Sequence, residues 1–132
     1  MVTRPTVLAR VADLVCVLVF AIVGRASHGE DLGALGIGTT AWPFVAGWVL
    51  GWVLTLLVPS ARARPAGVVA GVLVWVPTVV VGMLARLLTG AGVELSFVVV
   101  ATVVLGVFLL GWRGVAALVA RGRRQAPDDV RV

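Results

Sequence analysis

Four long apolar stretches occupy most of this chain of 132 residues, and they constrain its fold more than any other feature. They cover residues 7–24, 42–58, 66–88 and 96–119, and nearly all charge lies outside them. About 20 apolar residues are enough for a helix to cross a bilayer. The alternating pattern of a membrane barrel strand is absent, and helices satisfy their own backbone in lipid. The sequence therefore predicts an all-α fold, a bundle of four transmembrane helices joined by short loops.

The overall composition also points to a membrane protein. Hydrophobic residues make up 61% of the chain and charged residues only 13%, whereas soluble domains carry about 25% charged residues. A water-soluble fold of this composition would lack the polar surface to cover itself. We expect a single transmembrane domain over residues 1–120, followed by a polar, disordered cytoplasmic tail over residues 121–132.

The basic residues predict the orientation of the chain. All eleven are arginines, and with a cytoplasmic amino terminus nine of them fall inside the cell. Only Arg25 and Arg86 fall outside. Cytoplasmic loops are enriched in basic residues, so both termini are expected in the cytoplasm. The net charge of +5 is then a topology signal, and the expected partner is the lipid bilayer rather than nucleic acid.

The absence of lysine, together with abundant alanine, valine, glycine and arginine, suggests a GC-rich genome and a bacterial plasma membrane. The first apolar stretch could instead be a cleaved signal peptide, because basic residues precede it and small residues follow it. Asp13 argues against this alternative, since an acidic residue at the head of such a segment is unusual. We expect an uncleaved first span.

Glycines recur at a spacing of four in the second and third stretches. The two pairs are Gly47 with Gly51 and Gly67 with Gly71. Small residues on one helix face allow two helix backbones to approach closely. The loop between these stretches is short, so we expect the pairs to pack against each other near the cytoplasmic half. Lipid-facing glycines and a homodimer interface remain alternatives.

Pro77 and two tryptophans mark the interior of the second and third stretches. Pro77 removes one backbone hydrogen bond, so we expect a helix kink and a freed carbonyl near Leu73. Such breaks line the sites of transporters, but prolines are also tolerated in membrane helices. Trp48 and Trp52 share one helix face, and each indole N–H should find a partner or a cavity. Their role could be packing or a ligand platform.

Asp13 is the acidic residue that falls inside an apolar stretch. Acidic side chains within a span are costly and usually face a bundle interior or an aqueous cavity. Asp13 can pair with Arg10 one turn away or with Arg113 in the fourth stretch. It is therefore either an ion pair that holds helices together or a functional acid.

A polar cluster is expected at the opposite, outer face. The first and third stretches both run outward, and each ends on an arginine that could lie beside the other at the outer mouth. Two guanidinium groups suit a carboxylate, a phosphate or a lipid head group. Alternatively, each arginine snorkels or pairs with a nearby acid. The candidate functional residues here are Arg25, Ser27, His28, Arg86 and Glu94.

No catalytic or metal site is expected. Ser27 and His28 are adjacent, and neighbouring side chains on a helix point about 100° apart, so they do not form a nucleophile and its base. The chain has one histidine and one cysteine, and Cys16 lies inside the first stretch. Zinc or haem ligation is thus not supported. We expect no cofactor and no enzymatic activity.

Several elements in order carry a family resemblance. They are Asp13, Arg25-Ala26-Ser27-His28, Trp42-Pro43-Phe44 with Gly47, Trp75, Thr78, Gly82, Arg86 and Gly111-Trp112-Arg113. This set resembles a family of small four-span bacterial membrane proteins classed as a domain of unknown function. The resemblance covers nearly the whole chain and implies an integral membrane location. It implies no reaction, substrate or cofactor.

Two functions fit these observations. The first is small-solute or ion transport, channel-like, by an oligomer, with Asp13, the Pro77 break and the Arg25 and Arg86 mouth lining a polar route. The second is a non-catalytic accessory or assembly subunit that docks onto a larger membrane complex. An enzyme acting on lipid or quinone lacks a recognisable base, nucleophile or metal set.

Overall fold

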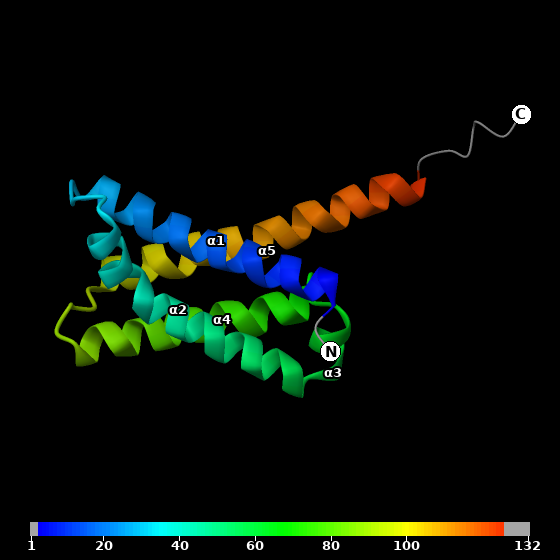
Figure 1. Cartoon of the computed structure of the whole chain (residues 1–132), viewed down its shortest axis with the longest axis horizontal. Helices are drawn as coiled ribbons and strands as arrows, with labels where there is room; N and C mark the ends of the chain where they lie inside the picture. Colours follow the sequence, from blue (N-terminus) through cyan, green and yellow to red (C-terminus); the bar gives the residue numbers. More distant parts are fainter. Residues whose placement is uncertain (1–2, 126–132) are drawn as a thin grey trace, which may run out of the picture.

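The structure is a helical bundle in which successive long helices run antiparallel (Figure 1). The computed structural model describes residues 3–125. Its helices are α1 (Arg4–Ser27), α2 (Ala34–Leu57), α3 (Pro59–Ala63), α4 (Val68–Leu88) and α5 (Leu95–Gln125). All but α3 are long and apolar enough to cross a membrane, which confirms the predicted four-span, all-α fold.

The antiparallel order gives the bundle two distinct ends. The amino terminus, α3 and the carboxyl-terminal part of α5 lie at one end, here called the terminal end (Figure 1). The connections 28–33 and 89–94 lie at the other, here called the loop end. Residues predicted to share one side of the membrane therefore share one end of the bundle.

Two boundaries differ from the apolar stretches. Helix α2 begins at Ala34 rather than Trp42, because its backbone hydrogen bonding continues through a more polar segment in which the Thr39 hydroxyl donates to the Leu35 carbonyl at 2.8 Å. Hydropathy marks the part suited to lipid, not the end of the helix. The short loop expected after α2 contains α3, which has Pro59 in its first turn, a position that proline favours.

The expected disordered tail is wrong for its first residues. Helix α5 continues to Gln125, so residues 121–125 are helical. Arginine and glutamine favour helix, and positive charges in the last turn stabilise the carboxyl-terminal end of the helix dipole. Residues 126–132 of the predicted tail lie outside the described residues.

Helices α2 and α4 make the most extensive helix–helix contact in the bundle. An added Cβ at Gly51 would stand 2.7 Å from Val74 Cα and 2.9 Å from the Leu73 oxygen, and one at Gly47 would stand 2.6 Å from Thr78 Cα. These are backbone atoms, so only glycine permits this approach. The carbonyl freed by Pro77, that of Leu73, thus lies directly against the Gly51 backbone.

The other glycine pair does not face α2 as expected. An added Cβ at Gly71 would meet Leu110 Cδ2 at 2.7 Å and Arg113 Cδ at 2.8 Å, both on α5. Gly67 is the N-cap residue of α4, and its nearest neighbour would be the Arg64 oxygen at 3.1 Å. A spacing of four places two glycines on one face, but it does not select which neighbouring helix that face meets. Gly71 makes room for the Arg113 side chain instead.

Phe44 lies at the centre of the core and is fully buried. Its ring packs edge-on against Phe20 of α1 at 5.1 Å between centroids and lies 6.4 Å from Phe97 of α5. Gly82 of α4 gives this ring its space, since an added Cβ would stand 2.5 Å from Phe44 Cδ1. One aromatic side chain of α2 thereby contacts all three other spans.

The lateral surface of the bundle is strongly apolar. Large hydrophobic side chains remain half exposed along every span, among them Val15, Val53, Val80, Val103 and Val107. A soluble monomer rarely exposes contiguous apolar patches of more than a few hundred Å². This surface is suited to contact with lipid.

We expect Gly51→Ala to destabilise the bundle, because the new methyl group meets α4 backbone atoms that cannot rotate away. Overpacking of this kind costs about 1–3 kcal/mol. Thermal unfolding of the purified protein in detergent measures the effect. Gly111→Ala is the matched control, because nothing lies within 4 Å of its Cβ position; equal melting temperatures for the two variants would contradict this packing.

Candidate functional site

A buried ion pair joins the first and last spans. Asp13 of α1 is fully buried, and Arg113 of α5 is 3% exposed. Arg113 Nη1 donates to Asp13 Oδ1 at 2.6 Å, and Nη2 donates to Oδ2 at 2.8 Å. This two-point geometry is the strongest arrangement of guanidinium and carboxylate. Of the two partners that the sequence offered for Asp13, the structure pairs it with Arg113.

Further hydrogen bonds hold both members of the pair. The Trp112 indole N–H donates to Asp13 Oδ1 at 2.7 Å. Arg113 also donates to the Leu109 carbonyl at 2.8 Å and to the Pro65 carbonyl at 3.1 Å. The cluster therefore ties α1, α5 and the connection before α4 together. Nothing in the sequence predicted the bond between Trp112 and Asp13.

Arg10 and two tryptophans lie near this pair without hydrogen-bond acceptors. The Arg10 guanidinium lies over the Trp52 ring, 5.3 Å from its centroid. Within the described part of the chain, Arg10 Nε and the indole N–H groups of Trp48 and Trp52 are buried and have no partner. The expected hydrogen-bond acceptor of each indole is therefore not found among the described residues. These side chains serve packing and a cation–π contact.

A cavity of about 570 Å³ opens at the loop end. Its walls come from the end of α1, the end of α4 and the start of α5, which meet at this end of the bundle (Figure 1). The polar residues that line it are Arg25, Ser27, His28, Glu30, Thr40, Arg86, Glu94 and Ser96. Five of these are the predicted candidate residues of the outer face, so the structure brings that whole set together. Asp13 is not part of this cavity.

Sequence reasoning missed Thr40, Ser96 and the apolar wall of the cavity. Thr40 lies in the helical segment that precedes the second apolar stretch, so it was treated as part of a loop. Phe20 and Phe97 line the deeper part of the cavity. The sequence signal for them was available, because each phenylalanine lies within one or two turns of a charged residue at a span end.

Arg25 is held by acids and is not free. Its guanidinium bonds Glu30 at 2.9 Å and the Asp31 side chain at 3.1 Å, and its Nε donates to the Asp31 carbonyl at 2.7 Å. Nη1 also donates to the Thr40 hydroxyl at 2.9 Å. Two carboxylates thus neutralise one guanidinium, and Arg25 mainly fixes the connection between α1 and α2.

Arg86 has a different environment. It donates to the carbonyls of Ala91 and Gly92, each at 3.2 Å, and its guanidinium stacks over the Phe97 ring at 4.2 Å. Among residues 3–125, no carboxylate forms a salt bridge with it. Arg86 is therefore positioned at the cavity by backbone carbonyls and an aromatic ring rather than by a carboxylate.

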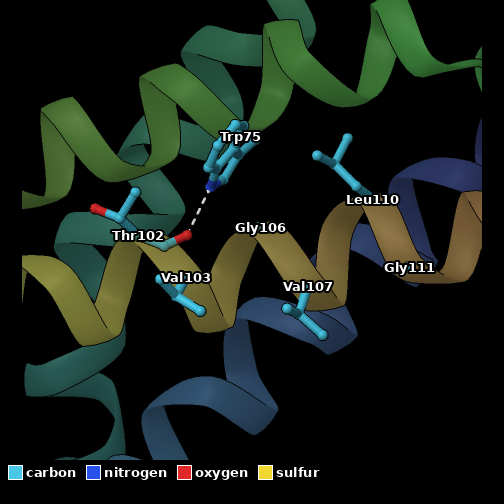
Figure 2. Close-up of a pocket in the computed structure, with 7 residues that line it drawn as sticks. All are labelled: Trp75, Thr102, Val103, Gly106, Val107, Leu110 and Gly111. Carbon is cyan, nitrogen blue, oxygen red and sulfur yellow. Dashed lines mark hydrogen bonds between the residues drawn. The ribbon is translucent and has the colours of Figure 1, made fainter.

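A second hollow, on the outer face of α4 and α5, has no free polar group. It is lined by Trp75, Val103, Val107 and small residues of α5 (Figure 2). The Trp75 indole N–H, its main polar group, donates to the Thr102 carbonyl at 3.0 Å. An apolar hollow on the lateral face fits lipid chains or helix packing, so we place the candidate site at the loop end.

The described residues contain no metal-binding group. Within residues 3–125, no three histidine, cysteine, aspartate or glutamate side chains come together in a way that could hold a metal ion. His28 and Glu30 line the cavity with Glu94, but they do not form such a set. The chemistry that this site offers is recognition by charge, hydrogen bonds and an apolar wall.

One family matches the chain. A family model described as a protein of unknown function (DUF3054) matches residues 10–116, a range that contains the buried ion pair and the loop-end cavity. No curated protein and no solved structure gives a match.

We expect Asp13→Asn to lower stability by roughly 3–5 kcal/mol, because it leaves the buried Arg113 charge without its partner. Replacing both residues, as Asp13→Leu with Arg113→Met, should restore most of this loss. Thermal or denaturant unfolding in detergent measures each variant.

The matched control is Glu30→Gln, which breaks the half-exposed pair with Arg25. Glu30 is 51% exposed, and such pairs contribute about 1 kcal/mol or less. Equal losses for Asp13→Asn and Glu30→Gln would contradict the structural role assigned to the buried pair.

Proposed function

The chain belongs to the DUF3054 family of proteins of unknown function, and we propose that it is a small-solute carrier. The resemblance drawn from its sequence motifs is thereby confirmed, as is its architecture of four membrane-capable helices. The observation that carries the proposal is the loop-end cavity, which gathers ionisable side chains beside an apolar wall at one end of a bundle whose lateral surface is apolar. A concave site with an apolar wall and a few convergent polar groups is the usual form of a small-ligand site.

Helices α1 and α5 contribute both to the cavity wall and to the buried ion pair. Phe20 of α1 and Phe97 of α5 line the cavity, and Asp13 of α1 bonds Arg113 of α5 nearer the terminal end. In our proposal, the ion pair closes one end of the route while the cavity is open at the other. Movement of α1 against α5 would close the cavity and open the pair, which is alternating access in its simplest form.

The glycine contact supports a mechanism in which α1 and α5 move while α2 and α4 stay fixed relative to each other. Helices α2 and α4 meet backbone to backbone at Gly47 and Gly51, whereas α1 and α5 touch each other far less extensively. The α2–α4 pair is then the fixed frame, and α1 and α5 are the moving elements. Carriage requires no catalytic residue and no cofactor, and we assign none.

We further propose a bacterial plasma membrane location with both termini in the cytoplasm. The distribution of arginines supports it: Arg62 and Arg64 lie at the terminal end, and Arg25 and Arg86 lie at the loop end. The cavity would then face the outside. Four helices enclose little volume, so we propose a homo-oligomer as the working form.

An accessory or assembly subunit is the second candidate, and α5 favours it. Beyond Arg113 this helix projects from the bundle (Figure 1), with Val115 at 61% and Leu118 at 66% exposure. A projecting apolar helix suits docking onto another membrane protein. Gentle extraction followed by native mass spectrometry separates the two candidates, because a stoichiometric foreign subunit supports the accessory role and a homo-oligomer supports the carrier.

Flux into liposomes tests the carrier directly. We expect the reconstituted protein to transport at least one member of a panel of small acids, amino acids and monovalent ions. Arg86→Gln should reduce that flux at least about tenfold, since a charged hydrogen bond contributes about 1.5–3 kcal/mol. Arg62→Gln is the control at the terminal end, where this side chain bonds only the Leu56 carbonyl at 3.4 Å. The absence of protein-dependent flux for the whole panel would overturn the proposal.

Topology has its own test. In a Cys16→Ala background, a cysteine at Ala91 should react with a membrane-impermeant thiol reagent added to intact cells, and a cysteine at Ser60 should not. The reverse labelling pattern would place the loop end in the cytoplasm and contradict the proposed orientation.

A further inference from the structure

The charges that line the loop-end cavity have opposite signs. Arg86 lies in the last turn of α4, and Glu94 directly precedes α5, so the two residues flank the same connection. Both side chains line the cavity, yet they form no salt bridge with each other. A guanidinium and a carboxylate in one cavity that do not pair can each bind a group of opposite sign on a ligand.

The other charged residues of the lining are already engaged. Arg25 bonds Glu30 at 2.9 Å and also bonds Asp31 at 3.1 Å, so neither its guanidinium nor the Glu30 carboxylate is free. Arg86 and Glu94 are therefore the two charged lining residues that no salt bridge within residues 3–125 engages. An inorganic anion would meet Glu94 as well as Arg86, and a simple cation would meet Arg86 as well as Glu94. Neither matches the cavity.

The deeper wall of the cavity is apolar. Phe20, Phe97, Val100 and Val104 line it, and the Phe97 ring also supports the Arg86 guanidinium. The volume of about 570 Å³ lies within the range of roughly 300–1,000 Å³ that is usual for small-ligand sites. A ligand that fills it would present an apolar body to the phenylalanines and a polar end to the mouth.

We propose that the cavity binds a zwitterion with an apolar body, its acidic group on Arg86 and its ammonium group on Glu94. This names the substrate class of the proposed carrier and so rests on that function, although binding itself can be measured without flux. Two sources share this chemistry: a free apolar α-amino acid and the head group of an aminophospholipid. The cavity recognises the pairing of ammonium and acid in either case.

Equilibrium binding to the purified full-length protein tests the proposal. The probes are L-leucine, 4-methylpentanoate, which lacks the ammonium group, and isoamylamine, which lacks the acid. The protein is held in nanodiscs of phosphatidylglycerol, a lipid without an ammonium group. We expect L-leucine to bind at least about tenfold more tightly than either analogue, because each analogue leaves one charged group without a partner.

A parallel measurement addresses the lipid source. Native mass spectrometry of protein taken from mixed membranes should show retained phosphatidylethanolamine in preference to phosphatidylglycerol if the head group is the ligand. Leucine binding without lipid preference identifies a free solute, and lipid preference without leucine binding identifies a head group; both outcomes support the zwitterion. Equal binding of all three soluble probes without lipid preference, or no binding of any probe and no preference, overturns it.

Single substitutions test which group of the ligand Arg86 and Glu94 each recognise. Glu94→Gln should abolish the preference for L-leucine over 4-methylpentanoate, and Arg86→Gln should abolish the preference over isoamylamine. The control is Arg62→Gln at the terminal end, which lies outside the cavity and should leave both preferences unchanged. If lipid is the ligand, Glu94→Gln should instead abolish the preference for phosphatidylethanolamine. Loss of both preferences in Arg62→Gln would show that they depend on the overall charge or fold of the protein and would contradict separate charge recognition.

Failure of this inference differs from failure of the carrier proposal. Flux of simple acids that depends on Arg86 but not on Glu94 would retain the carrier and overturn the zwitterion. Zwitterion binding with no flux of any solute would retain the zwitterion and overturn the carrier.

Discussion

The two-point bond between Asp13 and Arg113 is the interaction on which the rest of the arrangement depends. A lone buried charge would be very costly in a bundle of this composition, and the pair is tolerated because nearly every oxygen and nitrogen finds a bond. Trp112 and the Pro65 carbonyl contribute to that set, and among the polar atoms of the pair Arg113 Nε is the one left without a partner within residues 3–125. Because its members come from the first and last spans, the pair closes the sequence of helices into a bundle and leaves the opposite end free to form a cavity.

Close backbone contact is the second constraint, and it acts on a different pair of helices. Gly47 and Gly51 allow α2 to approach α4 at Leu73, Val74 and Thr78. The bundle therefore combines two kinds of helix contact. The α2–α4 contact depends on glycines, which have no side chain, and the α1–α5 contact depends on the charged side chains of Asp13 and Arg113. The first depends on close contact between backbone atoms, whereas the second depends on side-chain hydrogen bonds.

Hydropathy was sufficient to predict four spans and their order, because lipid leaves the backbone few alternatives. It also brought Arg25, Ser27, His28, Arg86 and Glu94 to one end, since alternating helix direction alone determines this. Other features depend on rotation about each helix axis, which a single sequence does not encode. That is why Gly71 faces α5 rather than α2, why Trp112 reaches Asp13, and why Arg25 pairs with carboxylates while Arg86, among residues 3–125, does not. The start of α2 was missed because helical hydrogen bonding extends beyond the apolar segment.

Helix α5 is unbroken from Leu95 to Gln125, a length of about 46 Å at 1.5 Å per residue. Phe97 on the cavity wall, Arg113 in the ion pair and the basic residues near its carboxyl end thus belong to a single stiff rod. This rod is longer than the hydrocarbon core of about 30 Å. Its tilt must therefore follow the thickness of the surrounding bilayer, and any change in that tilt acts as a lever on the cavity and the ion pair together.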